Sequence, residues 1–189
     1  MRKTAEPYPD FINIRNVLIA AIAALLVSSS SLVAQRPSDS VATQKQAMQK
    51  LAFIVGRWSG PVTITRGPGQ TLHLTQTENV EYKLDGLVLL VQGKSIDTEG
   101  KTQFEALATI SYDDATHNYR IRAYNDGHYI DTELTVQPDG FSWGFPAGPA
   151  KIVNDMHLTS KGEWQENTDV TFGRTPPHHS MEMLLQHQP

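Results

Sequence analysis

Two glutamates interrupt segments in which alternate residues are otherwise mostly apolar. Glu78 falls in residues 72–84 and Glu166 in residues 164–172. Because successive side chains of a strand point to opposite faces, each carboxylate should share a face with apolar neighbours. Two such carboxylates could act as general acid and base if they converge with shifted acidity. The predicted inward residues are Leu72, Leu74, Gln76, Glu78, Val80, Tyr82 and Leu84 in the first segment, and Trp164, Glu166, Thr168, Val170 and Phe172 in the second.

These polar interruptions have two explanations, which the sequence leaves open. A β-bulge could turn Gln76 and Glu78 outward, or they could lie at a wet, open rim. Alternatively, they line a pocket. No residue is assigned a catalytic role. Under the pocket hypothesis, the ligand-binding residues are Gln76, Glu78, Tyr82, His128, Trp164 and Glu166.

The seven histidines raise the question of a metal site. Only His128 shares an apolar face, with Ile130 and Leu134 among others, which places it at a rim or in a pocket. His178 and His179 are adjacent, so on a strand they would point in opposite directions. The pattern predicts no metal site.

Nucleophilic catalysis has one candidate motif. The segment Gly140-Phe-Ser142-Trp-Gly144 spells G-x-S-x-G, which in α/β-hydrolases is a strained turn between a strand and a helix. No helical pattern follows here, and the aromatic alternation of the segment predicts a strand. The chain has no cysteine, which excludes disulfides, thiol catalysis, thiolate metal ligands and lipoprotein attachment.

The elements that position these residues are mostly short strands. Nine turn signals separate ten segments of alternating pattern, and Asp-Gly turns favour hairpins between consecutive antiparallel strands. Closure into an up-and-down barrel would remove the sheet edges, so an all-β barrel of about ten strands is predicted, with a two-sheet sandwich as the alternative. The turn signals are Gly67-Pro68-Gly69, Asp85-Gly86, Glu99-Gly100, Asp113 to Thr116, Asp126-Gly127, Pro138-Asp139-Gly140, Ala147-Gly148-Pro149, Lys161-Gly162 and Gly173 to Pro177.

One short amphipathic helix should precede the barrel. Asp39 or Ser40 could cap its start and Gly56 could end it. Residues 35–40 are polar and are predicted to be a flexible lead-in, and residues 41–189 form the barrel domain. The apolar stripe of the helix consists of Val41, Met48, Leu51, Ala52 and Val55.

Residues 1–34 have the layout of a secretory signal peptide. Basic residues precede an 11-residue apolar core at 17–27, which is shorter than the roughly 20 residues that a membrane-spanning helix needs. Cleavage after Ala34 would place the mature protein in the periplasm or outside the cell. The alternative is an uncleaved N-terminal anchor, so the membrane is a partner only through this segment.

The charge balance argues against nucleic acid as a partner. The chain carries 16 basic and 20 acidic residues, and cleavage would remove three basic and two acidic ones, changing the net charge from −4 to −5. Binding to phosphate backbones needs clustered lysine and arginine, and the sequence shows no such cluster.

The segment Leu51 to Gly60 resembles the opening of calycins, the group that contains lipocalins and fatty-acid-binding proteins. It contains G-x-W-x-G at Gly56, Trp58 and Gly60. The resemblance implies that these three residues form a structural plug at the closed end of a barrel. The chain is more closely similar to an uncharacterised family of secreted bacterial barrels with this opening, a Gly162-Glu-Trp segment and a last strand at 181–185.

More remotely, the opening resembles haem-binding barrels of the nitrobindin type. Those proteins ligate iron through a histidine inside the barrel, and no histidine here matches that position. The sequence therefore predicts neither haem nor another cofactor.

The function predicted from these features is that of an exported barrel holding a small, mostly apolar molecule. In a barrel of eight strands, side chains can nearly fill the interior. A barrel of ten strands is wider and leaves room for a ligand. Binding is favoured over catalysis. Two alternatives stay open: an envelope structural or protein-interaction domain with an inert core, and a hydrolase or isomerase-type enzyme using an interior carboxylate.

Overall fold

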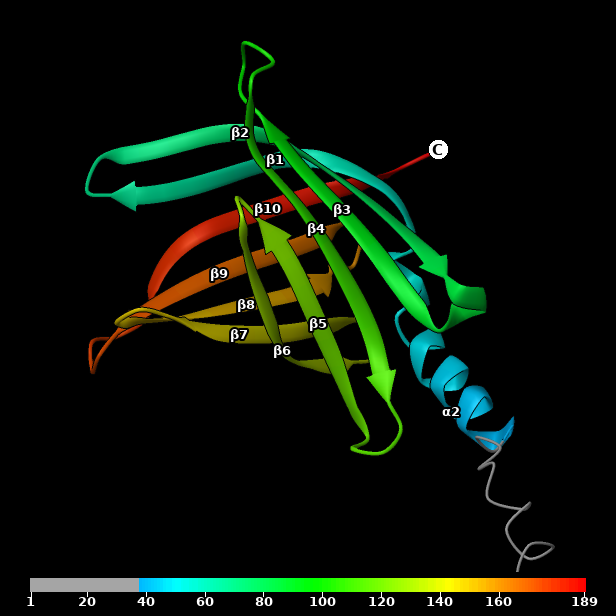
Figure 1. The fold of residues 1–189 in the computed structure, drawn as a ribbon. Coiled ribbons are helices and arrows are strands. Elements are labelled where there is room, and N and C mark those ends of the chain that lie inside the picture. Colours follow the sequence, from blue (N-terminus) through cyan, green and yellow to red (C-terminus); the bar gives the residue numbers. More distant parts are fainter. Residues whose placement is uncertain (1–37) are drawn as a thin grey trace, which may run out of the picture. The chain divides into compact units, whose positions relative to one another are not determined.

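The structure, a computed structural model, describes residues 38–189 (Figure 1). The predicted signal peptide lies outside the described residues. No helix in 38–189 has the length and apolar character needed to cross a membrane. The elements are α2 (Ser38–Gln49), the 3-10 helices η1 (Ala52–Ile54) and η2 (Leu84–Gly86), and the strands β1 (Gly56–Gly67), β2 (Gln70–Lys83), β3 (Val88–Ile96), β4 (Thr102–Asp113), β5 (Asn118–Asn125), β6 (His128–Gln137), β7 (Gly140–Ala147), β8 (Ala150–Leu158), β9 (Trp164–Phe172) and β10 (His178–Gln188).

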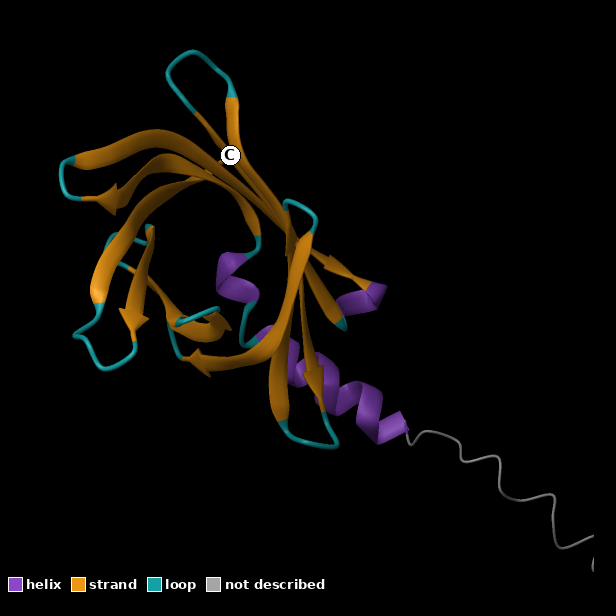
Figure 2. Ribbon diagram, turned by 60° about the vertical axis from the view of Figure 1, so that its left-hand side comes forward, coloured by secondary structure: helices purple, strands orange, loops and turns teal. Residues whose placement is uncertain are grey.

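The ten strands form a closed antiparallel barrel. Each strand pairs with the next along the chain, and β1 pairs with β10 to complete the ring. Figure 2 shows this ring, with a short helix inside its outline. Every predicted turn lies at a junction between strands, so the up-and-down barrel is confirmed and the sandwich alternative is wrong.

The turn between β5 and β6 illustrates how the sequence builds these hairpins. Asp126 has φ 48° and Gly127 has φ 76°, and two consecutive positive φ values are required by the hairpin turn whose twist matches that of paired strands. Asn125 and His128 form the first pair beyond the turn. The Asp-Gly dipeptide thus fixes the register of the whole hairpin.

The hydrophobic core lies at the end of the barrel where α2 and η1 are found. Met48, Leu51 and Ile54 are fully buried and belong to the same core cluster as inward residues of the strands. Tyr82 and Tyr119 donate hydrogen bonds to the carbonyl oxygens of Met48 and Ala47, at 2.9 and 2.8 Å. The last turn of α2 is therefore hydrogen-bonded to strands β2 and β5.

The predicted extent of the helix is corrected by the structure. The α-helix ends at Gln49 and a separate 3-10 turn follows, whereas the sequence pattern suggested one helix up to Gly56. Val41, expected on the apolar stripe, is 40% exposed. The reason is that the first turns dock through polar contacts: the Gln44 side chain donates to Asp114 at 2.9 Å. Residues 38–40 of the expected lead-in are helical.

Strand β1 packs closely against the end of β10. Trp58 is 3% exposed, and its Nε1 donates to the Ile54 carbonyl at 2.8 Å. A side-chain carbon at Gly60 would lie 2.1 Å from the carbonyl oxygen of Leu184, so only glycine fits there. Trp58 and Gly60 are therefore tightly packed between β1, η1 and β10, and their role as a plug stays a prediction. Gly56, at φ 130°, begins the same strand.

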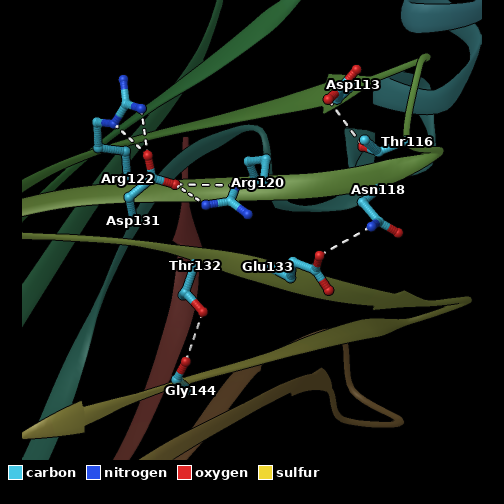
Figure 3. Close-up of polar contacts among 9 residues, drawn as sticks. All are labelled: Asp113, Thr116, Asn118, Arg120, Arg122, Asp131, Thr132, Glu133 and Gly144. Carbon is cyan, nitrogen blue, oxygen red and sulfur yellow. Dashed lines mark hydrogen bonds and ion pairs between the residues drawn. The ribbon is translucent and has the colours of Figure 1, made fainter.

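The outer surface of β5 and β6 carries an ion-pair cluster (Figure 3). Asp131 accepts hydrogen bonds from Arg120 and Arg122, with each Nε at 3.1 Å. The two guanidinium groups hold the pKa of Asp131 below its usual range. Because these side chains are largely exposed, their contribution to folding stability is small.

Candidate ligand-binding cavity

The barrel encloses a cavity of about 470 Å³ to which all ten strands contribute side chains. Phe141 and Trp164, both buried in the core, line it toward the helix end. Phe104, Asn125 and His128 line it toward the opposite end, where the structure is open to solvent. The volume lies within the range typical of small-molecule sites.

Small side chains make room for the cavity. Gly93, Ala106, Ala108 and Ala123 line it from β3, β4 and β5, where larger residues would fill the space. On β7, Trp143 stacks on a neighbouring phenylalanine with ring centroids 5.7 Å apart, and both rings line the cavity. The interior is thus mostly apolar, with aromatic rings available for contact.

A polar chain of side chains runs along the wall formed by β2 and β3. Ser95 donates to Gln76 Oε1, and Gln76 Nε2 donates to Glu78 Oε1 at 2.6 Å. The other oxygen of Glu78, Oε2, is buried without a partner. Pairing of β2 with both neighbouring strands is regular through 76 and 78, so the bulge explanation is wrong.

The second carboxylate lies nearby on β9. Trp164 Nε1 donates to Glu166 Oε2 at 3.0 Å. The Trp164 ring contacts the ring of Trp58, with centroids 5.7 Å apart, and Trp58 is directly opposite Glu78 in the β1–β2 pairing. Strands β2 and β9 are separated only by β1 and β10, as predicted for a closed barrel.

Burial dominates the acidity of both carboxyl groups. It raises the pKa of Glu78 to about 8, opposed by the hydrogen bond from Gln76 and reinforced by the nearby Glu166. Burial likewise raises the pKa of Glu166 to about 7, against the hydrogen bond from Trp164. Both groups can therefore gain or lose a proton near neutral pH, which is the property required of a general acid or base.

Asn154 on β8 is a cavity residue that the sequence interpretation missed. Its Oδ1 accepts a hydrogen bond from Thr168 at 2.7 Å, while its Nδ2 is buried without a partner and the residue is only 6% exposed. Its position between Ile152 and Met156 on alternate residues could have revealed it. It is a further polar interruption of an inward apolar face.

Five of the six predicted ligand-binding residues line the cavity, and Tyr82 does not. Gln76, Glu78, Trp164 and Glu166 line the cavity together. His128 lies at the open end, is exposed, and places its Nδ1 2.8 Å from a backbone carbonyl oxygen.

Residues at the ends of the predicted inward faces do not line the cavity. Tyr82 packs against the core, whereas Phe172, the last residue of β9, is 52% exposed. Tyr82 is not among the residues that line the cavity, because its hydroxyl reaches the end of α2. Leu84 was expected to point inward but is 72% exposed. Strand β2 ends at Lys83, and Leu84 begins the turn η2 with φ 50°.

The structure also places the histidines and the G-x-S-x-G segment. Within residues 38–189, no three histidine or acidic side chains gather as a metal site would require. His179 instead lies 3.1 Å from Asp169, and the ring of His187 contacts Trp58. Ser142 lies within β7, between the cavity-lining Phe141 and Trp143, so the G-x-S-x-G segment is a strand and not a nucleophile turn.

Comparison with known proteins shows similarity of fold to a solved structure. No protein-family model matches the chain, and no curated protein matches its sequence. The molecule belongs to the class of closed, ten-stranded antiparallel barrels with an interior cavity. Among solved structures, it is similar to Rv2717c from M. tuberculosis with a TM-score of 0.58 and 10% identity, over 76% of this chain and 98% of that one.

Proposed function

We propose that this protein is a calycin-like carrier or receptor that binds a small, mostly apolar molecule inside its barrel. The observation that supports this most directly is the 470 Å³ cavity, lined by apolar and aromatic side chains and containing buried polar atoms without partners. Unpartnered buried polar groups are costly, so a ligand that supplies their hydrogen bonds would be favoured.

The proposal includes the cellular setting predicted from the sequence. The signal-like segment at 1–34 supports export to the periplasm or the medium, where such a barrel would meet its ligand. Neither a cofactor nor a nucleic acid is part of the proposal.

A cavity-filling substitution tests this function. Ala108→Phe adds a ring on the inner face of β4, and Thr109→Phe adds the same ring on the outer face of the next residue. We expect native mass spectrometry of protein purified from its own host to show a bound small molecule in wild type and Thr109→Phe. Ala108→Phe should lose that molecule.

Thermal unfolding of both variants controls for misfolding, because overpacking costs about 1–3 kcal/mol. If Ala108→Phe stays folded and retains the molecule, or if wild type carries none and takes up no apolar probe, the cavity is not a binding site.

A further inference from the structure

We propose that the molecule held by the barrel is a lipophilic amine, whose ammonium group binds between Glu78 and Glu166 while its apolar part fills the rest of the cavity. This inference rests on the proposed binding function and specifies the chemistry of the ligand. Three observations carry it: the charges that line the cavity, the unpartnered carboxylate oxygen, and the apolar surroundings of both acids.

The charged lining is acidic. Glu78 and Glu166 line the cavity, and across residues 38–189 no lysine or arginine side chain does so. His128 and Tyr129, toward the mouth, are the other titratable lining residues. Two carboxyl groups without a basic partner are suited to a cation and repel an anion, because like charges in a partly dry site are poorly screened.

The hydrogen-bonding capacity of the site also fits an ammonium group. Glu78 Oε2 is a buried acceptor without a donor. Glu166 accepts from Trp164 through one of its two oxygens. An ammonium group offers several donors and no acceptor, and its hydrogen bonds to carboxylates are among the stronger ones in proteins. The free Nδ2 of Asn154 needs an acceptor, which a water in the cavity could supply.

The surroundings explain why the site should select amines instead of other polar ligands. Without a cation, burial keeps the two carboxyl groups partly protonated, as their raised pKa values indicate. Binding of an ammonium group would stabilise the ionised forms and release a proton to solvent. Asp155 also raises the pKa of Glu166, so its charge adds to the negative potential at the site.

A matched series of ligands tests the inference. Decylamine, decanol and decanoate share one apolar chain and differ in charge, and each would compete with the neutral dye Nile red at a pH of about 9, where both glutamates are ionised in the folded protein. We expect decylamine to bind at least about tenfold more tightly than the other two. Glu78→Gln and Glu166→Gln should each reduce that preference, and Glu81→Gln, outside the set of residues that line the cavity, should not.

The outcomes separate the two proposals. If Nile red binds but decanol or decanoate competes as well as decylamine, the amine assignment is wrong and the binding function stands. A preference for decylamine that survives both glutamine substitutions also overturns the assignment. If Nile red and all three ligands fail to bind, the binding function itself is wrong. Each variant is checked for a wild-type circular dichroism spectrum, and the two glutamine variants serve as independent tests.

Discussion

At the residue scale, Glu78 and Glu166 make the free energy of unfolding depend on pH. Their pKa values in the folded protein, about 8 and about 7, exceed the ordinary value of 4.5. The folded state therefore holds these protons more tightly than the unfolded state. Stability from this source is fully present below pH 4.5 and is lost as the pH rises through the folded pKa values.

The double variant Glu78→Gln, Glu166→Gln should remove this dependence. We expect wild-type protein without ligand to lose stability on the order of 6 kcal/mol between pH about 5 and about 9, and the variant to lose much less. Urea unfolding at both pH values measures the difference. Glu81→Gln is the control, because Glu81 is half-exposed and lies 2.8 Å from Lys83. Equal pH slopes in wild type and the double variant would contradict the raised pKa values.

Strand periodicity predicted correctly that both carboxylates point inward. It did not predict which residues at the ends of strands line the cavity. Glu78 and Glu166 are inward because alternation holds through the middle of a regularly paired strand. Tyr82 stands near the end of β2, where its hydroxyl finds a carbonyl of α2. Asn154 follows the same alternation, so its inward position could have been predicted in the same way. Contacts between separate elements, in contrast, do not follow from a period within one segment.

At the element scale, β1 joins the helix end of the barrel to the closing seam. Trp58 donates to the carbonyl of Ile54 in η1, and its ring contacts Trp164 of β9 and His187 of β10. One side chain thus connects η1, which is adjacent in sequence, to two strands from the other end of the domain. The helix prediction from sequence was only partly correct because the first turns of α2 dock through the polar contact between Gln44 and Asp114, which an apolar stripe does not predict.

Trp58→Ala should destabilise the barrel by about 3–5 kcal/mol, as expected for truncation of a buried aromatic side chain. Trp143→Ala is the matched control, because Trp143 is only half-buried and faces the cavity. Its loss should affect ligand retention more than stability. Chemical denaturation of both variants provides the comparison, and equal costs for the two tryptophans would contradict a plug role for Trp58.

At the scale of the whole molecule, the predicted cleavage site lies before the first described element. All ten strands and α2 lie within residues 38–189, so cleavage after Ala34 would leave every described element intact. We expect N-terminal sequencing of protein recovered from the periplasm or medium to begin near Gln35. An intact N-terminus on protein from the membrane fraction would favour the uncleaved anchor.

More of the barrel architecture than of the cavity could be predicted from the sequence. Ten strands and their order follow from turns such as Asp126-Gly127, which act locally. The cavity depends on which small residues from different strands share the interior, among them Gly93, Ala106 and Ala123. Shape of that kind arises from packing across the barrel, so no single segment encodes it.

The pairing of β1 with β10 has a consequence for how the chain avoids self-association. Nine pairings join consecutive strands, whereas this one joins Arg57 to Gln188 across the whole domain, which carries the largest loop-closure entropy. While this seam is open, two strand edges are unpaired, and such edges template pairing with other chains. Weakening the seam would therefore favour dimers in which two copies exchange β10.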